Sequence, residues 1–308
     1  MRPTFDRLLS LLFTVSFPFL LAPSCARPPR TLDLQGHRGA RGLYPENSLP
    51  GFAYAYGLPE VSTLELDVVI SGDGRVVISH EPWLNPEICS VDSAVVAENP
   101  LAYNLFRMTV DSLQRFDCGS KGNARFENQT ALPTYKPTLW ELFELLDSLS
   151  TANGTPWPNL NIETKSQPKG DQQFHPGPKV FMGILANEIR LAYSTFPDAQ
   201  LQDRITIQSF DPRTLKALRN EFLGVKSCLL VEGEADPEAE MDAMGFAVDI
   251  YSPSFELVTP ELVQWCHFRS IAVIPWTVNE VADMQRLVDM GVDGLISDYP
   301  NKFAQLVY

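Results

Sequence analysis

Acidic side chains recur on one face of two predicted strands. In the segment TLELDVVIS, side chains alternate between the two faces of a strand, so Glu65 and Asp67 point the same way. In the later segment NLNIETK, the same alternation groups Glu163 with Asn161 and Lys165. Buried carboxylates are costly unless a positive charge meets them, and three oxygen donors suit Mg²⁺ or Ca²⁺ better than zinc. The pattern therefore favours one divalent cation, with ion pairs to basic side chains as the alternative.

Two histidines lie where such strands would bring them close to the acids. The segment GHRG places His37 and Arg38 at the end of the first predicted strand, among glycines that let the backbone approach a ligand. The sequence SGDG favours a hairpin after the strand that carries Asp67, because Asp-Gly is a hairpin turn signal. An antiparallel pair would place His80 nearly opposite Asp67 and close to Glu65. A histidine beside carboxylates is suited to proton transfer.

Together these residue types suit the cleavage of a phosphodiester. A metal and fixed cations, here Arg38 and Lys165, neutralise the charge that develops on the phosphoryl oxygens. One histidine removes a proton from the attacking hydroxyl or water, and the other protonates the leaving alkoxide. Phe210 and Trp276 lie at the ends of predicted strands and would line the substrate mouth, although aromatic residues at such positions more often belong to the core.

The elements that must position these side chains are alternating strands and helices. Candidate strands cover 32–37, 62–70, 75–80, 159–165, 203–208, 225–231, 247–251, 271–276 and 293–296, and candidate helices cover 138–149, 178–193, 212–222, 260–268 and 279–290. The helices carry apolar residues every three or four positions, and their expected N-caps are Thr138, Asp211, Thr259 and Asn279. This pattern predicts an α/β fold, a slightly irregular (β/α)₈ TIM barrel. A doubly wound sheet is the competitor, but the sequence lacks its nucleotide-binding glycine loop.

One segment interrupts the alternation. Residues 81–136 are rich in proline, asparagine and small polar residues, and we interpret them as a loop-rich insertion in a single domain that spans 31–308. Four cysteines of this domain allow three disulfide pairings. We favour Cys89–Cys118, because both lie in the insertion, and we read Cys228, in an apolar run, as a buried thiol.

The first 26 residues have the form of a signal peptide. Arg2 and Arg7 precede an apolar run that is too short to span a membrane as a helix. Two processing patterns stay open, ordinary cleavage after small residues and lipid attachment at Cys25. We expect export to the periplasm or beyond, which would permit disulfides.

The overall charge limits the partners. The 308 residues carry a formal net charge of −14, with a sequence pI near 4.7. An acidic chain repels nucleic acid and anionic membranes, so we expect no nucleic-acid partner and membrane contact only through a lipid anchor. An anionic substrate would need local positive charge. The sequence indicates no oligomeric state.

The motifs GHRGARGLYPENS, ELDVVISGDGRVVISHEP, NIETK, QSFD, PWTVN and DGLISDYP, in this order, resemble the glycerophosphodiester phosphodiesterase family. The resemblance spans about 37–300, and the insertion resembles that of the family's exported, periplasmic type. Two positions depart conservatively from the usual motifs, namely Ser48 after PEN and Glu81 after His80. The resemblance implies a (β/α)₈ barrel that hydrolyses small-molecule glycerophosphodiesters to glycerol 3-phosphate and an alcohol.

The resemblance also implies roles for the candidate residues. His37 and His80 would be the acid/base pair, Glu65, Asp67 and Glu163 the metal ligands, Arg38 and Lys165 the phosphate ligands, and Phe210 and Trp276 the border of the glycerol and headgroup pocket. Glu46 and Asn47 would steady the loop that carries the first histidine.

Two other functions stay open from the sequence. A phospholipase C- or D-like enzyme could cleave intact or lyso-phospholipids through a cyclic phosphate, because a glycerol hydroxyl can attack phosphorus internally. A barrel that only binds headgroups would be expected to have lost a histidine or a metal-binding acid, and this sequence retains them all. These motifs do not show whether the cation is Mg²⁺ or Ca²⁺, and they do not show which headgroup the substrate carries.

Overall fold

The computed structural model describes residues 31–308 with the exception of 100, 222–223 and 235. They form one compact unit, Thr31–Tyr308. The predicted signal peptide, including Cys25, lies outside the described residues. Within these residues, no helix is long and apolar enough to cross a membrane.

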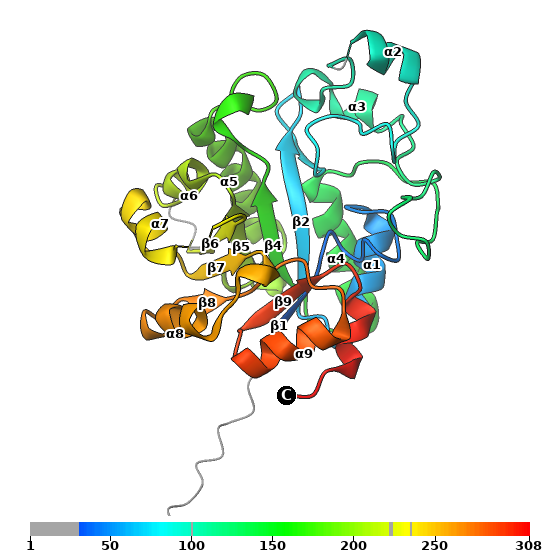
Figure 1. Ribbon diagram of the computed structural model, residues 1–308. Coiled ribbons are helices and arrows are strands. Elements are labelled where there is room, and N and C mark those ends of the chain that lie inside the picture. The colour runs from blue at the N-terminus through cyan, green and yellow to red at the C-terminus, as the bar shows by residue number, and fades with distance from the viewer. Residues whose placement is uncertain (1–30, 100, 222–223, 235) are drawn as a thin grey trace, which may run out of the picture. The chain divides into compact units, whose positions relative to one another are not determined.

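Eight of the described strands follow one another in a parallel barrel (Figure 1). They are β1 (Asp33–Gly36), β2 (Thr63–Ile70), β4 (Asn159–Thr164), β5 (Ile205–Ser209), β6 (Lys226–Val231), β7 (Ile250–Pro253), β8 (Ala272–Val273) and β9 (Gly294–Ser297). Neighbours pair in the order β8-β7-β6-β5-β4-β2-β1-β9. The ends meet where Asp293 N donates to Val273 O at 2.8 Å and Ile296 N donates to Pro275 O at 3.0 Å. The predicted TIM barrel is therefore confirmed.

The strand β3 (Val76–Ile78) departs from the parallel pattern. It pairs antiparallel with β2, with Val68 opposite Ile78, as the Asp-Gly turn predicts. The strand is shorter than expected, and Ser79 N donates to Asp67 O at 3.0 Å. Ser79, not His80, therefore lies opposite Asp67, and the histidine follows in the loop.

The described helices alternate with the strands, and all but two, which lie in the segment between residues 79 and 138, cover the outside of the barrel. They are α1 (Leu49–Tyr56), α2 (Ser93–Glu98), α3 (Val110–Leu113), α4 (Leu139–Asn153), α5 (Pro178–Thr195), α6 (Pro212–Leu218), α7 (Pro237–Met244), α8 (Pro260–Phe268) and α9 (Val281–Met290). The side chains of Thr138, Asp211 and Thr259 cap α4, α6 and α8 as predicted. The expectation for Asn279 is wrong, because Glu280 is the N-cap of α9.

The barrel is held together by apolar side chains between sheet and helices. Leu64, Leu66 and Val68 point outward from β2 into a cluster that also contains Phe143 of α4 and Phe181 of α5, all fully buried. Each such side chain contributes about 1.5–3 kcal/mol relative to an exposed one. Because these residues alternate with Glu65 and Asp67, packing this face forces the acids inward.

The segment between β3 and α4 contains α2 and α3, which lie beyond the carboxyl end of β2 (top of Figure 1). Cys89 and Cys118 form a disulfide there, as predicted, and belong to a separate buried apolar cluster that includes Leu84, Leu105 and Leu113. Cys228 is a free, buried thiol, also as predicted. The disulfide and this small apolar cluster hold the segment together at the mouth of the barrel.

Candidate active site

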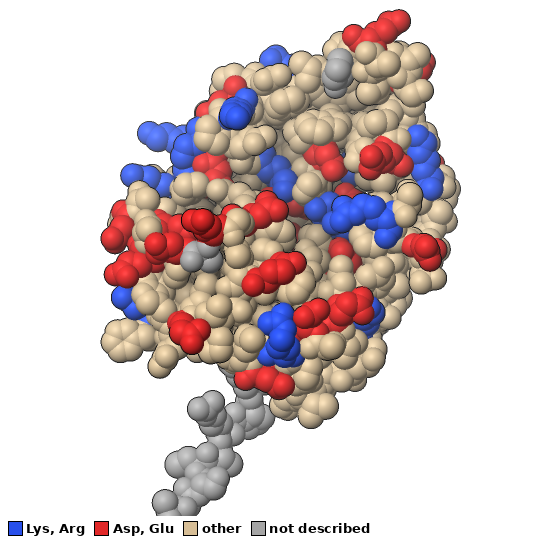
Figure 2. Space-filling model, viewed as in Figure 1, with Lys and Arg blue, Asp and Glu red and all other residues tan. Residues whose placement is uncertain are grey.

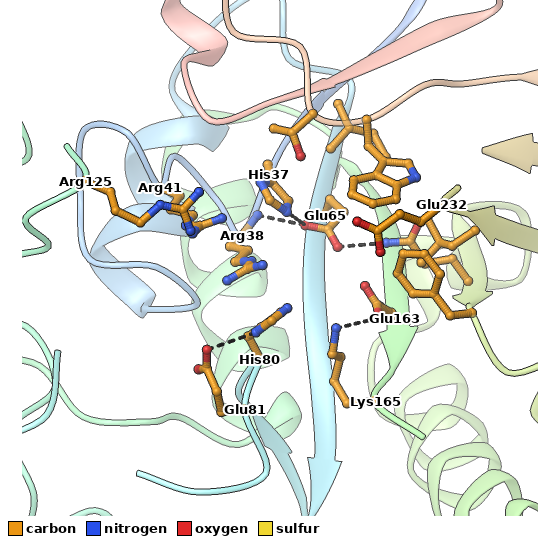
Figure 3. A pocket seen from close by; sticks show the side chains of 16 residues that line it. His37, Arg38, Arg41, Glu65, His80, Glu81, Arg125, Glu163, Lys165 and Glu232 are labelled. Carbon is orange, nitrogen blue, oxygen red and sulfur yellow. Dashed lines mark hydrogen bonds and ion pairs between the residues drawn. The ribbon is translucent and has the colours of Figure 1, made fainter. Parts of the chain in front are cut away.

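Polar side chains follow the barrel strands at their carboxyl ends. His37 comes directly after β1, Lys165 after β4, Phe210 after β5, Glu232 after β6 and Asp298 after β9. The carboxyl ends of the parallel strands meet at one end of the barrel, and TIM-barrel enzymes carry their active sites at this end. A cavity of about 360 Å³ opens at this mouth. Its lining includes His37, Arg38, Glu65, His80, Glu163, Lys165, Phe210 and Trp276 (Figure 3).

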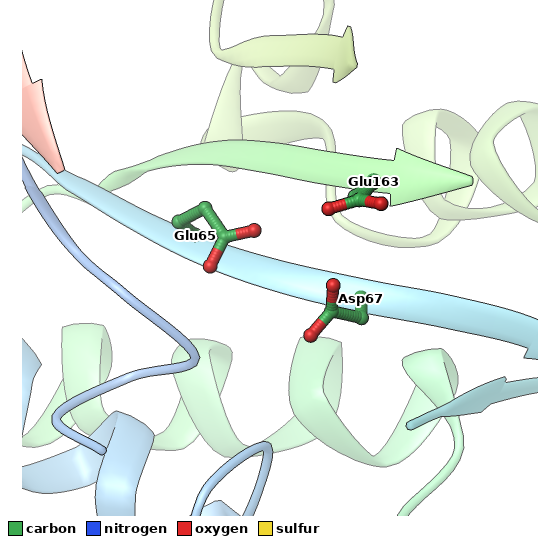
Figure 4. Close-up of side chains that lie close together, drawn as sticks. All are labelled: Glu65, Asp67 and Glu163. Carbon is green, nitrogen blue, oxygen red and sulfur yellow. The ribbon is translucent and has the colours of Figure 1, made fainter. Parts of the chain in front are cut away.

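Three carboxylates lie close together on β2 and β4 (Figure 4). The register of β2 with β4 places Asp67 beside Glu163, and Glu65 lies two residues earlier on the same face. Glu65, Asp67 and Glu163 are buried, and each offers one oxygen within 4.8 Å of the other two. The structure thus brings together the three acids that the sequence analysis grouped.

The charges of these acids are only partly balanced. Burial, with repulsion from Asp67 and Glu163, raises the pKa of Glu65 well above its ordinary range. Burial also raises the pKa of Glu163, although Lys165 Nζ lies 2.6 Å from its Oε1. Burial opposes ionisation of Asp67 as well, but Arg38 and Lys165 hold its pKa well below the usual value.

The donor set fits a hard divalent cation. Oδ1 of Asp67 is buried, accepts no hydrogen bond from any described residue, and lies 3.5 Å from Lys165 Nζ. An added positive charge would meet this oxygen and relieve the repulsion on Glu65. Carboxylate oxygens are the ligands that Mg²⁺ and Ca²⁺ prefer. The buried acidic triad could therefore bind a divalent metal ion.

The loop after β1 holds His37 tightly. Its Nδ1 lies 2.6 Å from Oδ1 of Asp298, and its Nε2 lies 3.9 Å from Glu65 Oε2. Burial lowers the pKa of His37, against the opposing effect of Asp298. The ionised carboxylate of Asp298 can only accept a hydrogen bond, so Nδ1 carries a proton and donates it to this bond, and Nε2 is the nitrogen left to face the cavity.

The backbone of this loop is unusually confined. Arg38 adopts φ 50° and Gly39 φ 85°, and a Cβ on Gly36 would lie 2.2 Å from the carbonyl oxygen of Gly39. Only glycine fits at Gly36, and this close packing turns the Arg38 N–H toward Glu65 Oε2 at 2.8 Å. Gly36 and Gly39, on either side of His37 and Arg38, thus allow this loop to pack closely against β2.

His80 occupies the other side of the mouth. Its side chain is 32% exposed, and its Nδ1 lies 3.1 Å from Oε1 of Glu81. Burial would raise the pKa of Glu81, but the bond to His80 and the charge of Lys136 lower it to about 2. Glu81 is therefore ionised at neutral pH and fixes the orientation of the imidazole, which lines the cavity.

Two cations flank the carboxylates. Arg38 contacts Glu46 through Nη1 at 3.1 Å and Asp67 through Nε at 3.2 Å. Asn47 Nδ2 donates a hydrogen bond to Asp67 Oδ2 at 2.7 Å. Glu46 and Asn47, which we expected to steady this loop, therefore both contact residues of the site. Lys165 lies between Glu163 and Asp67. Both cations line the cavity.

Several residues that contact the site were not assigned a role from the sequence. Asp298 orients His37, Gln208 donates to Glu65 Oε1 at 2.7 Å, and Arg41 contacts Glu46 at 3.0 Å. Arg125, from the segment between β3 and α4, and Glu232 also line the cavity. Gln208 and Asp298 fall within the quoted motifs QSFD and DGLISDYP, so the motifs carried a signal that residue types alone did not.

Residues 37–302 match the family model described as the glycerophosphoryl diester phosphodiesterase family. The chain belongs to this family. It is 28% identical over 274 residues to a glycerophosphodiester phosphodiesterase of Caldanaerobacter subterraneus subsp. tengcongensis, covering 88% of this chain and 96% of the relative. A Bacillus subtilis glycerophosphodiester phosphodiesterase is 26% identical over 90% of this chain and 86% of its own. The chain is thus a phosphoric diester hydrolase.

Solved structures agree with this membership. A putative glycerophosphoryl diester phosphodiesterase of Silicibacter pomeroyi superposes with a TM-score of 0.75 at 28% identity, over 90% of this chain and 93% of that one. An Oleispira antarctica phosphodiesterase shares the fold, with a TM-score of 0.67 at 19% identity over 89% of this chain and 95% of that one. The barrel is therefore the family's fold.

Proposed function

We propose that this chain hydrolyses glycerophosphodiesters to glycerol 3-phosphate and an alcohol, using two histidines and one divalent cation, Mg²⁺ or Ca²⁺. The observation that carries the proposal is the meeting of His37, His80, Glu65 and Glu163 at one cavity, with Asp67 beside the two glutamates. The Oleispira antarctica relative was solved in complex with the product sn-glycerol-3-phosphate, which supports the same substrate class here.

Each residue of the site has a proposed task. Glu65, Asp67 and Glu163 would hold the cation, which when bound neutralises charge on the phosphoryl oxygens. Arg38 and Lys165 orient the phosphate: Arg38 is buried and Lys165 partly buried, and against the effect of burial the neighbouring acids raise the pKa of both, so that both stay charged at neutral pH.

The two histidines move protons on opposite sides of the phosphate. His37 exchanges a proton through Nε2, since Asp298 retains the proton on Nδ1. His80 acts likewise through Nε2, with Glu81 on its Nδ1. One accepts the proton of the attacking water and the other protonates the leaving alkoxide. Phe210 and Trp276 border the organic part of the substrate.

The test follows glycerophosphocholine by phosphorus NMR in ¹⁸O-labelled water. We expect glycerol 3-phosphate with label in the phosphate, and loss of turnover on chelation or in Glu65→Gln. The exposed Glu261→Gln of α8 is the matched control and should retain full activity. Full activity in EDTA would refute the metal role, and accumulation of an unlabelled cyclic phosphate would show the internal, phospholipase C-like route instead.

We also propose export of the mature domain. The N-terminal segment has the pattern of a signal peptide. The Cys89–Cys118 disulfide supports an oxidising compartment, because such bonds are rare in reducing cytosol. Mass spectrometry of the mature N-terminus, after fractionation, would separate simple cleavage from a lipid on Cys25.

A further inference from the structure

The cavity has a second region beyond the carboxylates, formed by the ends of β5 and β6 and by α7. Phe210, Leu230 and Glu232 line the catalytic cavity and also an adjoining, mostly apolar cavity of about 470 Å³. The two spaces therefore share one wall. A substrate whose phosphate lies at the triad would extend its leaving group along this wall or toward the opposite, arginine-lined side.

Two aromatic rings lie at this wall: Phe210 lines both cavities, and Trp276 lines the catalytic one. Phe210 and Trp276 pack edge to face, with ring centroids 5.3 Å apart and planes at 88°. Trp276 Nε1 donates to Ser252 O at 2.9 Å, which fixes the indole. Phe210 nevertheless leaves 40% of its surface exposed. An anchored aromatic surface open to a polar cavity is a feature that ligands contact.

The charges of the cavity are divided between its two sides. Figure 3 shows Arg38, Arg41 and Arg125 on one side and Glu232 on the other, with Glu65 between them. On the face in Figure 2, acidic side chains gather over α7 (left), and basic ones lie beside the central hollow. Glu232 forms no ion pair with any residue that the structure describes. Its carboxylate is free for a ligand.

We propose that Glu232, Phe210 and Trp276 form a subsite for a cationic headgroup, of the choline or ethanolamine class. The inference rests on the proposed diesterase function and adds the headgroup to it. An ammonium is attracted both by a carboxylate and by aromatic faces, and quaternary ammonium ligands are recognised in this way. The methyl groups of choline also match the apolar side chain of Leu230.

The opposite side does not suit such a headgroup. Arg38, Arg41 and Arg125 would repel a cation and attract a phosphate. A zwitterionic diester therefore has one favourable orientation, with its anion toward the arginines and the triad and its cation toward Glu232. A diester with an uncharged headgroup can form hydrogen bonds to the carboxylate, which a glutamine could also accept, but it gains no attraction between opposite charges.

The experiment compares kcat/KM for glycerophosphocholine and glycerophosphoglycerol, whose headgroup is neutral. We expect the native protein to prefer the choline diester by about tenfold, the size of one cation–π and carboxylate contact. Glu232→Gln should lower kcat/KM for the choline diester about fivefold, mainly through KM, and change the glycerol diester by less than about twofold. Phe210→Leu should act in the same direction.

The control is Glu234→Gln, an exposed acid of the same loop that does not line the cavity. Equal effects of Glu232→Gln on both substrates, or an equal effect of Glu234→Gln on the choline diester, would overturn the subsite. A native protein that turns over both diesters equally would do the same. If the native protein hydrolysed neither diester, the proposed function itself would fail, which is a different result.

Discussion

Replacement of Asp298 by asparagine should separate the orientation of His37 from the binding of substrate. The carboxylate lies 2.6 Å from His37 Nδ1, and both groups are buried. Asparagine keeps the size and one oxygen, and Asn279 can still contact it, but the negative charge is lost. An asparagine amide can also donate to Nδ1, which would move the imidazole proton to Nε2 and block proton acceptance there.

The expected magnitude follows from this contact. A hydrogen bond to a charged partner contributes about 1.5–3 kcal/mol, and the short, buried geometry places this one near the upper end. A loss of about 2–3 kcal/mol in the transition state corresponds to about a 30- to 150-fold decrease in kcat. KM should change little, because Asp298 does not line the cavity.

The assay is steady-state release of glycerol 3-phosphate from glycerophosphocholine. The matched control is Asp293→Asn, which alters another histidine–aspartate contact, to His267 at 2.8 Å, ahead of β9 at the other end of the barrel. It should leave kcat within about twofold. A native kcat in Asp298→Asn, or an equal loss in the control, would refute the assignment of His37 as a proton-transfer residue oriented by Asp298.

Two further predictions concern stability. Burial raises the pKa of Glu188 to about 7, above the value of about 4.3 in the unfolded chain. The contribution of this group to stability is therefore fully present below about pH 4.3 and is lost as the pH rises through about 7. Glu188→Gln should therefore gain up to about 2 kcal/mol over the native protein in urea unfolding at pH 8 and much less at pH 5, whereas an equal gain at both would contradict the reasoning. The Cys89–Cys118 bond spans 29 residues, so the double serine variant should lose about 3 kcal/mol; an unchanged urea midpoint would show that the bond does not constrain the unfolded chain.

The periodic parts of the fold could be predicted from sequence because each is locally determined. Alternation in TLELDVVIS gives both the strand β2 and the inward acids. The capping box of Thr138 and Glu141 marks the start of α4. Helix α1 was not expected, because Pro50 and Gly51 make its short sequence look like a loop. Helix α7 was missed because only Met241 and Met244 are buried in an otherwise polar turn.

The site was predicted less completely, because part of it depends on distant pairings. Asp298 is 261 residues from His37, and only the closure of β9 onto β1 brings them together. Another contact of Asp298 explains why Asn279 is not the N-cap of α9. The side chain of Asn279 forms hydrogen bonds with Asp298 instead of with the start of the helix. Strand register beyond one hairpin cannot be read from local pattern, so such partners become visible only in three dimensions.

The most direct test is a crystal structure of the protein grown with Mn²⁺ and glycerol 3-phosphate, with anomalous data that locate the metal. The account predicts one strong peak within bonding distance of Glu65, Asp67 and Glu163, and a phosphate between Arg38 and Lys165 that both imidazoles can reach. A metal bound elsewhere, or a phosphate held without any metal at the three acids, would contradict it.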